Sequence, residues 1–226
     1  MRAKAQDHHW ISEQNGESRR VFYFTDAESG IKVLDSNKIK LSHFDQCNDV
    51  FELAHFSLRD KEVRTRYEAW RSQIRPNFGF VCFCSQWWNP LMWGHYAKNG
   101  TGMCLVIDAQ PSELTYVKYE PSGAMPSPPN RFPSEADSEF QKFCSVKSSH
   151  WSYESESRFM RHFSDPRVTE VITANGPIKL FPLDKELRVV GVVNGPRNLK
   201  HRSDLQCVLK GRKYAQSRAA FGDYRI

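Results

Sequence analysis

The chain has 226 residues, of which 39% are apolar, and a formal charge of +6. This length suffices for one domain with a full core, and the apolar content excludes a disordered chain. No apolar run approaches the roughly 18 residues of a membrane helix, and the polar N-terminus lacks a secretory signal. We therefore expect a cytoplasmic protein with six reduced cysteines and no membrane partner.

Strands and helices are predicted in turn along the first half of the chain. Residues 20–25 read as a strand, and Asp26 is a natural cap for a helix through Leu34. Residues 39–42 alternate as a half-buried strand does, and residues 57–75 carry one helical stripe of apolar side chains that Pro76 closes. A strand at 80–85, a helix from Asn89-Pro90 to about Gly100 and a strand at 103–107 follow.

The second half begins with residues 121–133, which hold five of the twelve prolines and predict an exposed loop or insertion. Ser134 with Asp137 resembles a capping box, which predicts a helix towards Lys147. Strands are expected at 158–163, 170–173, 178–181 and 188–193, with a helix at 203–210. Because no strict βαβ alternation is present, the pattern favours an α+β fold. We predict a polar extension over 1–19 and a single α+β domain over 20–226, with the proline-rich insertion near 119–133.

The densest polar motif is Trp-Ser-Tyr-Glu-Ser-Glu-Ser-Arg at residues 151–158. If it begins a strand, residues two apart share a face, so Glu154, Glu156 and Arg158 line up together. Two neighbouring carboxylates repel each other, so a raised pKa or an intervening cation is expected, and Arg158 could supply that cation. The alternative is an ordinary ion pair at a solvent-facing strand edge.

Two other segments carry polar groups among apolar ones. On the helix after Pro90 we expect Met92 and Trp93 to pack in the core, and Tyr96 to reach a cleft with its hydroxyl. Residues 45–52 are rich in short polar side chains, so turns and caps are expected there. No Gly-x-Gly-x-x-Gly or Walker loop is present, and the cysteine and histidine spacings are a poor match to zinc sites.

Positive charge is concentrated in two segments. Between residues 196 and 226, eight Lys or Arg face two acids, which gives a net charge of +6. The second concentration consists of Arg59, Lys61, Arg64, Arg66, Arg71 and Arg75. Clustered positive charge favours nucleic acid or a dinucleotide as partner, and the alternative is a solvated basic surface. In the C-terminal segment we assign Lys210, Arg212, Lys213 and Arg218 to nucleic-acid binding.

The order of these segments resembles the bacterial family known as domain of unknown function 2971. The resemblance covers nearly the whole chain from about Arg20. Eight segments match the family pattern in order: the opening aromatic strand at 22–25, Ser42, the turn at 45–52, Phe-Cys-Ser at 83–85, Met-Trp-x-x-Tyr at 92–96, Gly102, the motif at 151–158 and the strand and turn at 189–197. The turn departs from the family pattern, which has Phe before the asparagine and Pro after the aspartate. The turn positions are therefore weaker site candidates.

The opening segments are also similar, more distantly, to ADP-ribosyltransferases that modify nucleic acids. That resemblance implies a split β-sheet core with flanking helices, and NAD held by Tyr23, Thr25, Ser42 and Tyr96. It further implies Glu156 as the essential glutamate, Glu154 orienting or deprotonating the acceptor, and Arg158 pairing with pyrophosphate. A carboxylate suits this reaction, because breaking the nicotinamide–ribose bond builds an oxocarbenium-like cation.

These resemblances lead us to expect transfer of ADP-ribose from NAD to RNA or DNA, as a toxin or antiviral effector. NAD would be a substrate, no metal would be required, and an antitoxin or regulatory protein would be a further partner. Two alternatives stay open. One is a Mg²⁺-dependent nuclease that uses Asp45, Asp49, Glu154 and Glu156. The other is a non-catalytic module that binds nucleic acid through the basic tail and exposed aromatic side chains.

Overall fold

The computed structural model describes residues 9–13, 16–54, 57–121, 130–134, 137, 139–219 and 226. Helices and strands are mixed along the chain, which confirms the α+β class. The chain divides into two compact units, each assembled from segments that are far apart in the sequence. Unit 1 comprises Met1–Lys38, Cys84–Pro111 and Leu183–Ile226, and unit 2 comprises Ile39–Phe83 and Ser112–Pro182. Most of the proline-rich segment falls at 122–129, outside the described residues.

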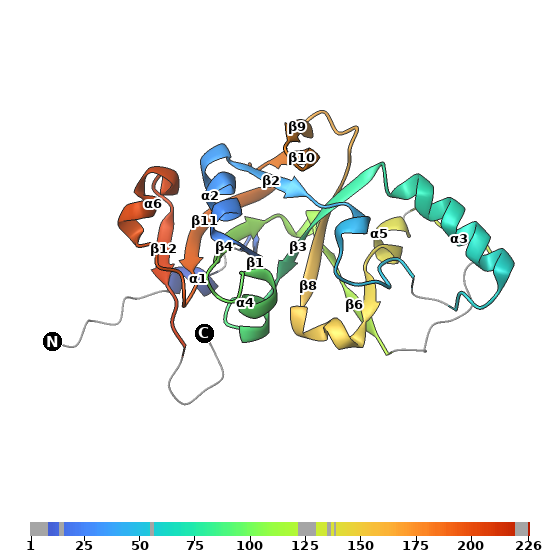
Figure 1. Cartoon of the computed structure of the whole chain (residues 1–226), viewed down its shortest axis with the longest axis horizontal. Helices are drawn as coiled ribbons and strands as arrows, with labels where there is room; N and C mark the ends of the chain where they lie inside the picture. Colours follow the sequence, from blue (N-terminus) through green and yellow to red (C-terminus); the bar gives the residue numbers. More distant parts are fainter. Residues whose placement is uncertain are drawn as a thin grey trace. The chain divides into compact units, whose positions relative to one another are not determined.

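Unit 1 is built on four hydrogen-bonded strands in the order β12-β11-β4-β1 (Figure 1). Their bounds are Arg19–Thr25 for β1, Met103–Ala109 for β4, Leu187–Asn194 for β11 and Lys213–Gln216 for β12. β4 pairs antiparallel with both β1 and β11, and β12 runs parallel to β11. Every residue of β4 is buried, as expected for a central strand covered on both faces.

The described helices of unit 1 are α1 (His9–Ser12), α2 (Ala27–Ser36), α4 (Pro90–Tyr96) and α6 (Arg202–Leu209). Three of the four begin within one residue of the predicted start, and α1 was not predicted. The side chain of Asp26 caps α2 and that of Asn89 caps α4, each by accepting a hydrogen bond from a main-chain N–H of the first turn. α2 packs on β4 and α6, and α4 packs on β1. Met92 and Trp93 are buried, which confirms their predicted core position.

A buried arginine joins the strands of unit 1 to α1. Nε of Arg20, in β1, donates to Oδ1 of Asp108 in β4 at 2.7 Å. Nη1 of Arg20 donates to the main-chain oxygens of Trp10 and Ile11, and Arg188 donates to the second oxygen of Asp108 at 2.9 Å. Each buried charge is thus hydrogen-bonded, which offsets the cost of removing it from water. The sequence predicted neither this contact nor α1.

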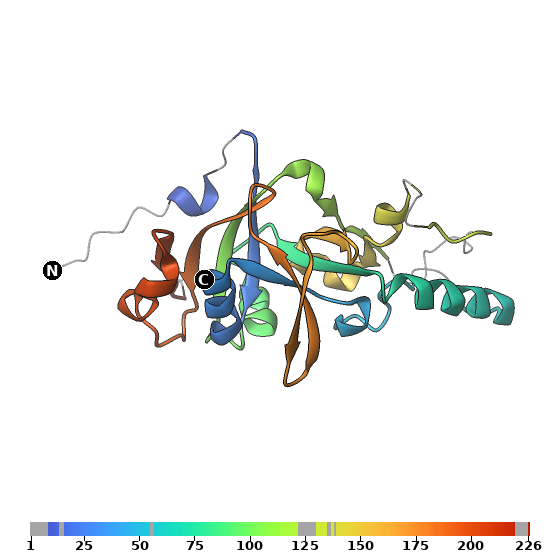
Figure 2. The same ribbon diagram turned by 90° about the horizontal axis from the view of Figure 1, so that it is seen from above.

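Unit 2 contains three groups of strands, in the orders β3-β8-β5, β2-β10-β9 and β6-β7. The bounds are Lys38–Leu41 for β2, Phe78–Cys84 for β3, Thr115–Tyr116 for β5, Lys118–Glu120 for β6, Val146–Ser148 for β7, Glu156–His162 for β8, Thr169–Thr173 for β9 and Gly176–Pro182 for β10. Figure 2 shows β9 and β10 as an antiparallel hairpin, with Gly176 paired to Thr173 next to the turn.

Two helices and three short 3₁₀ segments complete unit 2. They are α3 (Lys61–Ile74), α5 (Phe140–Phe143), η1 (Phe44–Gln46), η2 (Pro111–Glu113, which starts at the unit boundary) and η3 (Ser149–Glu154). Asp60 caps α3 through the N–H groups of Glu62 and Val63, and the buried side chains of Tyr67, Trp70 and Ile74 confirm the predicted stripe.

The predicted helix from residue 134 to Lys147 is wrong in extent. Asp137 does accept hydrogen bonds from the main-chain N–H and the hydroxyl of Ser134, as in a capping box. In this stretch, however, the described helix is confined to Phe140–Phe143, and residues 146–148 pair with β6 as a strand. Tertiary pairing and the burial of Lys147 outweigh the local helix preference there.

Gly102, directly before β4, supplies a test of close packing in unit 1. A Cβ at this position would lie 2.2 Å from the main-chain oxygen of Thr25 and 2.9 Å from the main-chain oxygen of Ala97. We expect Gly102→Ala to lower the free energy of unfolding by about 1–3 kcal/mol, because main-chain atoms cannot rotate away as a flexible side chain can. Urea unfolding followed by tryptophan fluorescence measures the change.

The matched control is Gly94→Ala in α4, where a Cβ would meet nothing within 4 Å. That substitution should leave stability unchanged or raise it by up to about 1 kcal/mol through helix propensity. Equal effects at the two glycines would contradict the close approach at Gly102.

Candidate active site

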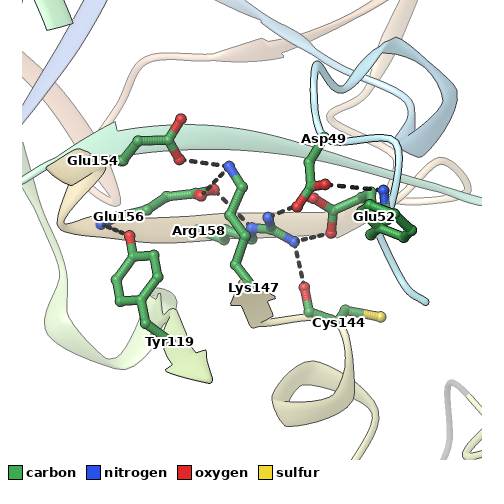
Figure 3. Close-up of polar contacts among 9 residues, drawn as sticks. Asp49, Glu52, Tyr119, Cys144, Lys147, Glu154, Glu156 and Arg158 are labelled. Carbon is green, nitrogen blue, oxygen red and sulfur yellow. Dashed lines mark hydrogen bonds and ion pairs between the residues drawn. The ribbon is translucent and has the colours of Figure 1, made fainter. Parts of the chain in front are cut away.

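Five buried charged side chains form one network inside unit 2 (Figure 3). The members of this glutamate network are Glu52, Lys147, Glu154, Glu156 and Arg158, joined by ion pairs of 2.5–3.2 Å. Three carboxylates face two cations, so the ionised network carries one negative charge in excess. Buried charges are tolerated only when they are paired and hydrogen-bonded, so this arrangement constrains every chain segment that contributes to it.

The motif at 151–158 bends where the sequence predicted a continuous strand. Glu154 is the last residue of η3, Ser155 adopts a left-handed conformation with φ 43°, and β8 begins at Glu156. The prediction that Glu154 lies on the strand is therefore wrong. The hydroxyl of Ser148 accepts a hydrogen bond from the main chain of His150, which favours a helical turn at this point. Within β8 the predicted alternation is confirmed, because Nε of Arg158 donates to Oε1 of Glu156 at 2.7 Å.

Arg158 and Glu52 are the most deeply buried members of the network, each with 1% of its side chain exposed. The two terminal nitrogens of Arg158 donate to the two carboxylate oxygens of Glu52 at 2.6 and 2.9 Å, and Nη1 also donates to the main-chain oxygen of Cys144 at 2.5 Å. This bidentate geometry is the strong form of an arginine–carboxylate pair. It favours a structural role in positioning Glu156 over the expected contact of Arg158 with pyrophosphate.

Lys147 is the cation that lies between the two glutamates of the motif. Its Nζ donates to Oε2 of Glu154 at 2.5 Å and to Oε2 of Glu156 at 3.2 Å, and it lies 4.8 Å from the ring centroid of Trp151. The sequence indicated that a cation is needed here but assigned the role to Arg158, which contacts Glu156 and Glu52 instead. Sequence reasoning missed Lys147 and read Glu52 only as part of the turn at 45–52, because no local pattern links either residue to the motif at 151–158.

The network fixes the protonation state of Glu156. Burial raises the pKa of its carboxyl group, but the charges of Arg158 and Lys147 outweigh burial and lower that pKa to about 2. For Lys147, burial lowers the pKa of the ammonium group, and the two glutamates outweigh it and raise the pKa. Near neutral pH Glu156 is therefore a fixed anion. A fixed anion can stabilise a developing positive charge but cannot act as a general acid.

The network approaches solvent at Cys82 in β3. Cys82 is an exposed free thiol, and it donates a hydrogen bond to Glu156 that helps to keep the carboxylate ionised. Although the side chain is accessible, crowding by protein atoms and the charge of Glu156 raise the pKa of the thiol. On another side of Glu156, its main-chain N–H donates to the hydroxyl of Tyr119 at 2.8 Å.

The four residues other than Arg158 that are expected to bind NAD are divided between the units. Ser42, in unit 2, exchanges two main-chain hydrogen bonds with Phe80, and the Phe80 ring lies 5.1 Å from the guanidinium carbon of Arg158. Tyr23 and Thr25, in unit 1, share one face of β1, where Tyr23 is half-buried and Thr25 is buried. Tyr96, also in unit 1, is half-buried at the end of α4 and is not sealed in the core.

Three of the four basic residues assigned to nucleic-acid binding have contacts within unit 1, and Nζ of Lys213 lies 5.9 Å from the ring centroid of Trp10. Nζ of Lys210 donates to the main-chain oxygen of Asp35 at 2.6 Å. Arg212 donates to the main-chain oxygen of Leu34 at 3.2 Å and to the side-chain oxygen of Asn37 at 2.7 Å. Both cations thus stabilise the C-terminal end of α2, where free carbonyl groups favour positive charge. Lys213 and Arg218 are exposed.

The four carboxylates of the nuclease alternative have different partners, although Glu154 and Glu156 share Lys147. Asp45 forms an ion pair with Arg75 at 2.5 Å, whereas Asp49 is buried and accepts a hydrogen bond from the main chain of Phe51. Across the part of the chain that the structure describes, no group of three or more His, Cys, Asp or Glu could hold a metal ion.

Comparisons with known proteins found no matching family model, no matching curated protein and no matching solved structure. Among the described helices, none has both the length and the apolar character to cross a membrane. The function therefore has to be inferred from the residues and the geometry of the glutamate network.

The Glu52–Arg158 pair generates a prediction on stability. Glu52→Gln leaves the buried guanidinium without one of its two counter-ions, so we expect a loss of about 3–5 kcal/mol in the free energy of unfolding. The matched control is Glu28→Gln, which removes the partner of Lys32 from a pair whose side chains are 79% and 73% exposed. Exposed pairs of this kind contribute at most about 1 kcal/mol. Similar losses in the free energy of unfolding for the two variants, measured in urea, would show that the buried pair contributes no more to stability than the exposed pair.

Glu156 generates a prediction on pH. Its folded-state pKa of about 2 lies below the value near 4.3 expected for an unfolded chain. The resulting stabilisation is complete above the unfolded value and is lost as pH falls towards 2. We expect the free energy of unfolding to decrease between about pH 4.5 and pH 2, with a smaller slope in Glu156→Gln than in Glu28→Gln. Equal slopes in the two variants would show that Glu156 is not the source of this pH dependence of stability.

Proposed function

We propose that the protein transfers ADP-ribose from NAD to nucleic acid, with Glu156 as the residue that stabilises the transition state. One observation carries the proposal: Glu156 is held as a buried anion, in a network with one excess negative charge, beside an exposed thiol. An anion fixed before the reaction starts needs no reorganisation when positive charge develops next to it. This property matches the oxocarbenium-like transition state that the resemblance to ADP-ribosyltransferases implies.

The proposed reaction needs charge stabilisation more than proton transfer to the leaving group. The bond between C1′ of the ribose and the ring nitrogen of nicotinamide breaks, and nicotinamide leaves as a neutral molecule with the bonding electron pair. Positive charge then resides on the ribose, where Glu156 stabilises it. A hydroxyl or ring nitrogen of the acceptor forms the new bond to C1′ and loses a proton. Glu154, which accepts a hydrogen bond from Lys147, is the group that we propose to orient the acceptor or to receive that proton.

Other parts of the proposal rest on the resemblance alone. Ser42, in the same unit as the network, is proposed to contact NAD. Tyr23, Thr25 and Tyr96, in unit 1, are proposed NAD contacts on the same ground. Four further points are proposed on the resemblance alone: the split-sheet fold of ADP-ribosyltransferases, membership of domain of unknown function 2971, a role as a toxin or antiviral effector, and a regulatory partner.

The test incubates the protein with NAD labelled in the adenylate moiety and, separately, with RNA, DNA and cell protein. We expect a mass increase of one ADP-ribose on nucleic acid and release of nicotinamide. Label on protein alone would overturn the proposed acceptor. Shortened strands without added mass would indicate a nuclease, and binding without covalent change would indicate a non-catalytic module.

The two glutamates should differ in effect. We expect Glu156→Gln to reduce nicotinamide release by at least about 100-fold, as loss of a charge-stabilising group does. We expect Glu154→Gln to reduce transfer to the acceptor more than hydrolysis of NAD to free ADP-ribose. Because Glu156→Gln also removes a counter-ion of two buried cations, rates are compared at a temperature where circular dichroism shows both variants folded. Near-normal nicotinamide release by folded Glu156→Gln would exclude Glu156 from the mechanism.

A further inference from the structure

Helix α3 carries four cations along one side. Lys61, Arg64, Arg71 and Arg75, which we call the α3 cation row, occupy positions i, i+3, i+10 and i+14. These spacings return to the same side of an α-helix, whereas the buried side chains of the helix lie on another. Lys61 and Arg64 are exposed, and Arg71 and Arg75 are half-buried.

Among the described residues, the hydrogen bonds of Arg64 and the ring contact of Arg71 involve uncharged groups. Nη1 of Arg64 donates to the main-chain oxygens of Leu58 and Arg59, which are uncharged groups. The guanidinium of Arg71 lies 5.7 Å from the ring centroid of Tyr67, which is neutral as well. Arg75, by contrast, pairs with Asp45. The row thus differs from the C-terminal segment, where Lys210 and Arg212 stabilise the end of α2.

The packing of α3 depends on its apolar side and not on the cation row. Trp70 is buried, its ring stacks on Phe132 with centroids 5.2 Å apart, and its Nε1 donates to the main-chain oxygen of Pro133 at 2.7 Å. Tyr67 and Ile74 are buried on the same side. The exposed cations of the row thus take no part in the buried packing of the helix, and their charges remain accessible to a partner.

We infer that the α3 cation row binds the phosphate backbone of a single-stranded nucleic acid. From Lys61 to Arg75 the row extends over about 21 Å at 1.5 Å per residue, a length that spans several phosphates of an extended strand. Cations on phosphates position a strand without reading its sequence. A membrane surface fits less well, because the apolar side chains of α3 face the core and cannot enter a bilayer.

The choice of partner rests on the proposed function, in which nucleic acid is the acceptor. A strand that is to be modified on a base has to be unpaired or extruded from its duplex, which favours a single strand. The row lies in the same unit as the glutamate network, whereas the C-terminal basic segment belongs to unit 1. Binding is independent of catalysis, so it can be measured with no NAD present.

The experiment measures the anisotropy of a fluorescent oligouridine with the full-length chain over a series of salt concentrations. For the triple variant Lys61→Gln, Arg64→Gln, Arg71→Gln we expect at least about tenfold weaker binding near 0.1 M salt. The slope of log K against log salt should become shallower by about 2, which is about 0.7 for each lost contact with a single strand. Thermal unfolding confirms that the variant is folded.

A second variant makes the result independent of any defect in the triple variant. Glu68 is an exposed acid of α3 that lies four residues after Arg64 and three before Arg71, which places it within the row. Glu68→Gln removes a repulsive charge and should tighten binding of the oligouridine. A triple variant at exposed lysines elsewhere, Lys98→Gln, Lys118→Gln, Lys185→Gln, removes the same charge and should have a much smaller effect.

Three results would overturn the inference. One is an unchanged salt slope in the α3 triple variant together with no effect of Glu68→Gln. Another is equal weakening by the lysine control, which would assign binding to net charge. The last is preferential binding of the row to vesicles of phosphatidylcholine and phosphatidylserine. If the wild type binds oligouridine through the row but releases no nicotinamide from NAD, the proposed function fails and the inference stands.

Discussion

The buried guanidinium of Arg158 is the constraint on which the candidate site depends. A guanidinium out of water is stable only when its donors are satisfied, and Arg158 satisfies them with Glu52, Glu156 and the main-chain oxygen of Cys144. Glu52 lies 106 residues before Arg158, so a single side chain fixes segments that are remote in sequence. Glu156 is then held in one position and one protonation state, which is the basis for the proposed chemistry.

The two glutamates of the motif occupy different electrostatic environments in spite of their closeness in sequence. Glu156 contacts both cations, whereas Glu154 forms an ion pair with Lys147. The bend at Ser155 creates this difference, because a continuous strand would have given both glutamates the same face. A shared lysine between two carboxylates also relieves their mutual repulsion. This division of environments is what allows one carboxylate to stabilise charge and the other to handle the acceptor.

Local signals in the sequence predicted much of the fold and, within the candidate site, the contact between Glu156 and Arg158. The caps at Asp26 and Asn89 and the two-residue spacing of Glu156 and Arg158 depend on neighbours a few positions away, and all three are confirmed. The partners Glu52 and Lys147 could not be predicted in the same way, because contacts across long separations select them. The left-handed Ser155 was missed for a related reason: serine has no strong preference for that conformation, so tertiary contacts determine it.

The interleaved composition of the two units has a consequence for synthesis of the protein. During translation, all residues of unit 2 have been added once the chain reaches Pro182, but unit 1 still lacks β11 and β12 at that point. β4 then has β1 as a partner on one edge and waits for β11 on the other. An unpaired central strand with an apolar surface is a site for incorrect association. In the ribosome-bound intermediate, one edge of β4 therefore stays unpaired and open to incorrect association until residues 183–226 emerge.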